Sequence, residues 1–131
     1  MSDTYYVKTF GGLEITNDNV TVNIVELFGK QLVNLLQVLL FHSEKPVQKD
    51  ELIDILWPES KNPSSALKFS IFRLRAELNE IEFFKDKEVI VTTRKGYILN
   101  PNLDWNIDFV ELEKAYNQIN DGSELLDERH I

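Results

Sequence analysis

The sequence predicts an α+β fold in which an N-terminal antiparallel sheet is followed by three helices and a C-terminal β-hairpin. Three observations support this order. Short β-branched and aromatic runs, separated by turn residues, occupy residues 5–25. Leucines at helical spacing dominate residues 32–78. The run EVIVTTRKGYIL, residues 88–99, then suggests two strands joined by a tight turn at a glycine.

The predicted sheet contains two or three short strands, at about Tyr5–Phe10, Leu13–Thr16 and Val20–Val25. A glycine pair at 11–12 and an Asn-Asp-Asn run at 17–19 separate these segments, and both are typical of tight turns. We therefore expect a small sheet of antiparallel strands at the start of the chain.

Two helices are predicted after the sheet. The first follows Gly29, ends before Pro46 and is apolar over most of its circumference, which indicates a buried helix. Its leucines recur at helical spacing, at Leu32, Leu35, Leu36, Leu39 and Leu40. The second helix is shorter and lies within QKDELIDILWPES. Asp50 and Glu51 occupy its first turn, where negative charge suits the helix dipole, and Pro58 ends it.

The third helix is predicted over residues 62–79, NPSSALKFSIFRLRAELN. Asn62 is a favourable N-cap, and Pro63 fits the first helical position because its missing N–H costs nothing there. The predicted buried stripe consists of Leu67, Ile71, Leu74 and Leu78. At about 100° per residue, the opposite side carries Ser65, Phe69, Phe72, Arg73 and Ala76, flanked by Lys68 and Arg75.

Residues after the hairpin are predicted to form a separate segment. PNLDWN, residues 101–106, is interpreted as a linker, and DFVELEKAYNQI, residues 108–119, as an amphipathic helix. Asp108 is its expected N-cap and Glu111 the capping-box partner. We therefore expect a first domain over residues 1–101 and a second segment over residues 102–131.

Composition indicates one folded, soluble protein without cofactor, metal or catalytic function. At 131 residues the chain can bury a core without cross-links, and 43% hydrophobic residues is an ordinary globular value. With no cysteine and two histidines, disulfides and the common zinc sites are excluded. No phosphate-binding glycine loop, G-x-S-x-G or H-E-x-x-H motif occurs. No leader or long apolar segment is present either, so we expect a cytoplasmic protein without membrane contact.

The formal charge of −8 is unevenly distributed. Residues 1–59 carry four Lys/Arg and nine Asp/Glu, residues 60–97 carry eight and five, and residues 98–131 carry two and eight. The middle third is therefore positive by three charges, between two acidic flanks. Such an asymmetry indicates where a polyanion could bind.

Two helices joined by a turn, the second cationic and followed by a basic-tipped hairpin, form the layout of a winged helix-turn-helix. A helix about 10–12 Å wide fits the major groove of B-DNA, and the hairpin can reach a neighbouring minor groove or the phosphates. Three segments carry a more specific resemblance: LIDILWP, ALKFSIFRLRAEL and VTTRKGYIL. They resemble the effector domain of OmpR/PhoB-type bacterial response regulators, and are more similar still to the antibiotic regulatory protein (SARP/AfsR) branch.

This resemblance implies that helix 62–79 lies in the major groove of double-stranded DNA and that the wing, residues 89–99, contacts the backbone or minor groove. The implied DNA-binding residues are Asn62, Ser64, Ser65, Lys68, Phe69, Arg73, Arg75, Arg94 and Lys95. The loop WPESKNP is similar to a segment that contacts RNA polymerase in some relatives. DWNIDFVELEKAY is similar to the start of a bacterial transcriptional activation domain.

We therefore predict sequence-specific DNA binding by a bacterial transcriptional regulator. Arg73 is expected to contact a base or a phosphate, Arg75 a phosphate and Phe69 a thymine methyl group, whereas Phe72 is expected to pack beneath the wing or the sheet. The alternative is a winged-helix protein-interaction module, motivated by the net charge and by Phe72, where response regulators often carry a basic residue. A homodimer on repeated half-sites is a further alternative, if the acidic flanks weaken binding to a single site.

Overall fold

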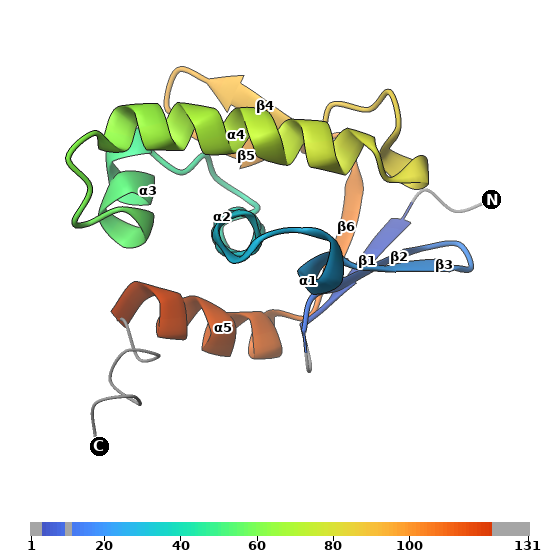
Figure 1. Ribbon diagram of the computed structural model, residues 1–131. Coiled ribbons are helices and arrows are strands. Elements are labelled where there is room, and N and C mark those ends of the chain that lie inside the picture. The colour runs from blue at the N-terminus through green and yellow to red at the C-terminus, as the bar shows by residue number, and fades with distance from the viewer. Residues whose placement is uncertain (1–3, 10–11, 122–131) are drawn as a thin grey trace.

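The computed structural model describes residues 4–9 and 12–121 and confirms the predicted α+β winged-helix architecture (Figure 1). The strands are β1 (Thr4–Lys8), β2 (Glu14–Asn17), β3 (Val20–Asn23), β4 (Ile90–Thr93), β5 (Gly96–Leu99) and β6 (Asp104–Ile107). The helices are α1 (Ile24–Leu27), α2 (Lys30–Phe41), α3 (Lys49–Leu56), α4 (Pro63–Asn79) and α5 (Phe109–Asp121), with a 3-10 turn η1 (Glu82–Phe84).

The N-terminal sheet has the strand order β3-β2-β1-β6. Its first three strands pair antiparallel, as predicted. The fourth is β6, which pairs parallel with β1 where a linker was predicted over residues 101–106. Trp105 of β6 lies opposite Tyr5, and their rings pack with centroids 5.4 Å apart. No local pattern could predict this strand, because its partner lies far away in the sequence.

The third strand is shorter than the predicted Val20–Val25, because the chain turns into the single-turn helix α1 after Asn23. The Asn23 side chain accepts a hydrogen bond from the Glu26 N–H at 3.2 Å and so caps this turn. Ile24 is buried as a result, whereas Val25 is exposed. The capping bond overrides the strand preference of the β-branched residues.

The three predicted helices are α2, α3 and α4. Figure 1 shows α2 end-on at the centre, between α4 and α5, and all five of its predicted leucines are buried. The predicted apolar stripe of α4 is buried as well, at Leu67, Ile71, Leu74 and Leu78. Asn62 precedes α4 as expected, but the hydrogen bond at this end runs from the Ala66 N–H to the Asn62 carbonyl rather than to its side chain.

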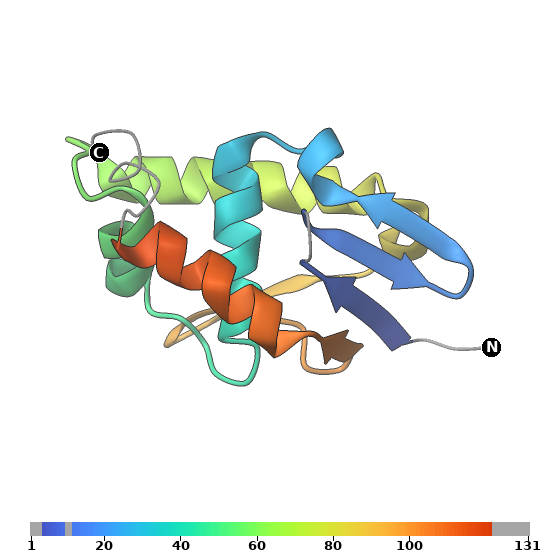
Figure 2. The ribbon, with the colours of Figure 1, turned by 90° about the horizontal axis from the view of Figure 1, so that it is seen from below.

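The predicted C-terminal amphipathic helix is α5, which lies across α2 (Figure 2). Leu112 and Tyr116 belong to the same buried core as the leucines of α2. The predicted capping partner Glu111 lies outside the residues whose side chains the structure describes. In the described ranges of the chain, no helix combines the length and apolar character needed to cross a membrane.

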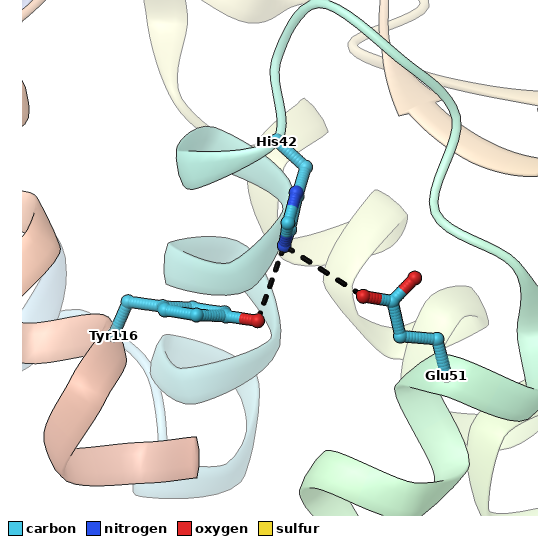
Figure 3. Close-up of polar contacts among 3 residues, drawn as sticks. All are labelled: His42, Glu51 and Tyr116. Atoms are coloured by element: carbon cyan, nitrogen blue, oxygen red, sulfur yellow. Dashed lines mark hydrogen bonds and ion pairs between the residues drawn. The ribbon is translucent and has the colours of Figure 1, made fainter.

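Aromatic and polar contacts attach α5 to the C-terminal end of α2 and, through His42, to α3. The ring of Tyr116 stacks on Phe41, with centroids 4.2 Å apart. The Tyr116 hydroxyl lies 3.2 Å from His42 Nε2, which is itself 3.9 Å from a carboxylate oxygen of Glu51 on α3 (Figure 3). Burial raises the pKa of Tyr116 above its ordinary value of 10.0, and the Glu51 carboxylate raises it further.

Candidate nucleic-acid interface

The wing is fixed to the core by the backbone of Val47. The Val47 N–H donates to the Tyr97 carbonyl at 2.8 Å, and the Tyr97 N–H donates back at 3.0 Å. Gly96 precedes this bridge with a φ of +140°. A Cβ atom there would lie 1.9 Å from the Val47 carbonyl oxygen, so only glycine allows the hairpin to approach this closely.

The wing tip consists of Arg94 and Lys95, between β4 and β5. The Thr93 hydroxyl donates to the Gly96 carbonyl and accepts from the Lys95 N–H, both at 3.1 Å, which fixes the turn. The side chains of Arg94 and Lys95 are exposed and line a hollow of about 440 Å³ at the start of α3, together with Gln48, Lys49 and Asp50. The tip is therefore part of a surface with three cations and one carboxylate.

Lys49 was not predicted to belong to this basic surface. Only the acidic residues in the first turn of α3 were considered, although this cation precedes them. No local sequence signal marks Lys49 as part of this surface. The pairing of Val47 with Tyr97 brings the start of α3 to the wing, and it connects residues about fifty positions apart.

The exposed face of α4 lies opposite its buried stripe and is apolar at its centre. Ser65 and Ala76 are exposed there, together with Phe69 and Phe72, which are 61% and 68% exposed. The prediction that Phe72 packs beneath the wing or sheet is therefore wrong. The reason is that the hairpin packs against a neighbouring flank of α4, at Arg75, and leaves the ring of Phe72 in solvent.

Arg75 joins α4 to the wing. Its Nη2 donates to the Ile90 carbonyl at 3.1 Å and to the Thr92 hydroxyl at 2.7 Å, while its Nε donates to the same carbonyl at 3.3 Å. The guanidinium carbon also lies 6.0 Å from the centroid of the Tyr97 ring. Half-buried in this position, Arg75 orients the hairpin relative to α4. Its predicted contact with a phosphate stays a prediction.

Arg73 lies on the other flank of the exposed face. Its Nη2 is 3.5 Å from a carboxylate oxygen of Glu77, and its guanidinium lies 5.8 Å from the centroid of the Phe69 ring. Glu77 lines a hollow shared with β3 and α1, whereas Arg75 contacts β4, so the two arginines flank Phe69 and Phe72 on opposite sides. An exposed ion pair of this kind is weak and leaves Arg73 accessible to a ligand.

The remaining predicted site residues lie at the beginning of α4 and are exposed: Asn62, Ser64, Ser65 and Lys68. Lys68 precedes Arg75 by two helical turns and therefore shares the flank that faces the wing. Figure 1 shows α4 and the β4–β5 hairpin along one side of the molecule, with α5 along the opposite side. The structure thus places Lys68 and Arg75 on the edge of α4 that faces the hairpin and Arg73 at the other edge.

Comparison with known proteins points to one family. Residues 20–99 match the family profile described as "Transcriptional regulatory protein, C terminal". A similar solved structure is the DNA-binding domain of E. coli CadC, with 27% identity and a TM-score of 0.52 over 66% of this chain and 78% of that one. Mycobacterium tuberculosis EmbR, solved in complex with a low-affinity phosphopeptide, shares the fold at 23% identity, with a TM-score of 0.53 over 74% of this chain and 24% of EmbR.

The search of curated proteins gave no significant match. The family profile nevertheless covers more than half of the chain, from β3 to the end of β5, and so includes the helix-turn-helix and the wing. The chain therefore belongs to the family of C-terminal domains of transcriptional regulatory proteins, the winged helix-turn-helix DNA-binding domains of OmpR/PhoB type.

Proposed function

We propose that the chain binds duplex DNA sequence-specifically, with α4 in the major groove and the β4–β5 hairpin on the adjacent backbone or minor groove. The observation that carries the proposal is the rigid link between the two elements. Arg75 of α4 donates three hydrogen bonds into β4, so the helix and the wing present their exposed sides in a fixed relation. A duplex needs such a relation, because the spacing between groove and backbone is itself fixed.

The cations around α4 are placed to contact the DNA backbone. Lys68 and Arg73 lie on the two flanks of the exposed face of α4, and Lys49, Arg94 and Lys95 line one hollow between the start of α3 and the wing tip. Asn62, Ser64 and Ser65 stand at the N-terminus of this 17-residue helix, where free N–H groups and the helix dipole favour a phosphate. Phosphate contacts of this kind position the helix, and contacts to base edges supply the specificity.

The proposal is tested by measuring the affinity for duplex DNA as a function of salt concentration. Wild-type protein should show a steep loss of affinity, with a logarithmic slope of about −0.9 for each phosphate contact. The double variant Arg94→Ala/Lys95→Ala should have a slope shallower by about 0.9 for each contact that it removes. Lys8→Ala, which removes an exposed cation from β1, is the matched control and should leave the slope unchanged. Affinity that does not depend on salt, or no binding at low salt, would contradict the proposal.

A second candidate function is favoured by one observation, the exposure of Phe69 and Phe72. Aromatic side chains are enriched at the centres of protein interfaces, so α4 could instead bind a protein partner. In that case Phe69→Glu should disrupt a complex that resists moderate salt, because the apolar contact is not screened. DNA binding predicts the opposite dependence on salt, so the same titration separates the two functions.

A further inference from the structure

The part of α4 that would lie deepest in a groove is apolar. Phe69 and Phe72 are more exposed than any other large apolar side chain in the described residues, and Ser65 and Ala76 beside them are small. A helix seated in the major groove directs the centre of its exposed face at the base edges and its flanks at the two backbones. The groups nearest the bases would therefore be two phenyl rings.

The cations of α4 are poorly placed to read bases themselves. The guanidinium of Arg75 is engaged by the Ile90 carbonyl and the Thr92 hydroxyl, so a bidentate contact with guanine would break bonds that hold the wing. Lys68 and Arg73 lie on the flanks of the exposed face, where the phosphate backbones pass. Specificity must then come largely from the centre of the face.

The major groove offers a phenyl ring one apolar partner, the C5 methyl group of thymine. Phe69 and Phe72 are three residues apart and lie on one face of the helix, with Cβ atoms about 5–6 Å apart by helical geometry. We propose that Phe69 and Phe72 read the methyl groups of thymines in neighbouring base pairs, so that the bound sequences carry A·T pairs beneath the centre of α4. This inference rests on the proposed function and names the sequence feature that α4 recognises.

Charge complementarity favours DNA over a protein as the occupant of this face. The two rings lie between Lys68 and Arg75 on one side and Arg73 on the other. The exposed turn of the wing, whose strand β4 is bonded to α4 through Arg75, adds two further cations. An apolar strip bordered by positive charge on both sides matches a groove in which methyl groups lie between two rows of phosphates.

The test uses the whole chain and starts from duplexes of random sequence, so the target site need not be specified in advance. Duplexes are first selected from this random pool by binding to the protein. Each thymine of a selected duplex is then replaced singly by deoxyuridine, which lacks only the methyl group. Removal of a contacted methyl should weaken binding about fourfold, the effect expected for one buried carbon. At least one such position is expected, and the remaining thymines serve as internal controls.

Variants then assign each methyl contact to a ring. Phe69→Ala and Phe72→Ala should each bind the thymine and deoxyuridine forms of one duplex position equally, while keeping the steep salt dependence. Phe109→Ala is the matched control, because Phe109 is 43% exposed on α5, on the opposite side of the molecule (Figure 1). It should keep the discrimination of the wild-type protein.

Failure of this inference can be distinguished from failure of the proposed function. Salt-dependent binding of a selected duplex with no effect of deoxyuridine at any position would overturn thymine recognition and leave DNA binding standing. No duplex binding at low salt would overturn both. A salt-resistant protein complex that Phe72→Ala disrupts, without selection of any duplex, would identify the face as a protein-docking surface and also overturn both. The deoxyuridine result with wild-type protein is independent of whether any variant folds.

Discussion

Two pairs of aromatic residues on opposite sides of the molecule have opposite environments. Phe41 and Tyr116 stack where α5 crosses α2, with rings only 11° from parallel, next to the fully buried Leu112. Phe69 and Phe72 on α4 face solvent between cations. All four lie on or at the end of amphipathic helices, so helical spacing alone does not decide their roles. The deciding factor is whether a second element packs there. We infer that the α5 side supports stability and the α4 side supports binding.

The net charge also differs between the segment with α4 and the wing and the segment with α5. The segment with helix α4 and the wing is positive by three charges, while residues 98–131, which include β6 and α5, are negative by six. The total of −8 thus conceals a basic surface on an acidic protein. We infer that phosphates are attracted to the positive segment and that the acidic residues limit the orientations in which DNA can approach.

The largest expected effect is on the α5 side and concerns stability. Leu112→Ala should lower the free energy of unfolding by about 2–5 kcal/mol, because it removes a fully buried side chain from the packing of α5 on α2. Urea denaturation measures the change. The matched control Phe109→Ala, at a position one turn earlier that is 43% exposed, should lower the free energy of unfolding by less than Leu112→Ala does. Equal effects of the two variants would show that α5 is not part of the core.

A smaller effect is expected on the α4 side and concerns binding. Arg73→Ala should weaken binding to all duplexes about equally and make the logarithmic salt slope shallower by about 0.9, because Arg73 lies on the flank of α4 where a phosphate would pass. The free energy of unfolding should stay nearly unchanged. Stability should not change because the ion pair with Glu77 is exposed. Fluorescence anisotropy and urea denaturation measure the two quantities. Unchanged affinity and specificity would remove Arg73 from the site.

Arg75 lies on the helix that we propose to bind DNA, but its hydrogen bonds hold the wing in place. Arg75→Lys keeps the charge but cannot reproduce the hydrogen bonds to the Ile90 carbonyl and the Thr92 hydroxyl. We expect a loss of about 1 kcal/mol in the free energy of unfolding, with little change in the salt dependence of binding. A variant as stable as the wild-type protein would mean that these bonds do not hold the wing.

The smallest effect is a dependence of stability on pH that originates at Tyr116. Its pKa is raised in the folded state by burial and then by Glu51, so folding favours the neutral phenol. This contribution is complete below pH 10.0 and is lost as the pH rises through the higher pKa of the folded protein. Tyr116→Phe should therefore lose less stability than the wild-type protein between neutral pH and pH values above 10.0. Parallel losses in the two proteins would contradict this assignment.

The features that could be predicted from the sequence are those with a local signal. The buried stripe of α4 follows from apolar residues three and four positions apart, and the wing turn follows from Arg94, Lys95 and Gly96 between two strand-like runs. The strand β6 was missed because β1, the strand with which it pairs, lies near the other end of the chain. For the same reason, the prediction that Phe72 is packed was wrong, and the hydrogen bonds from Arg75 to β4 were not predicted. Their environments depend on where the hairpin packs, which no helical pattern encodes.

We propose that α4 and the wing form the surface that contacts DNA. The most direct test of this proposal is to record the backbone amide NMR signals of the isotope-labelled chain while a selected duplex is added at low salt. The signals of Ser65, Phe69, Phe72 and Lys95 should shift strongly, while those of α5 should change little. Shifts concentrated on α5 or the N-terminal sheet, with α4 and the wing unaffected, would contradict it.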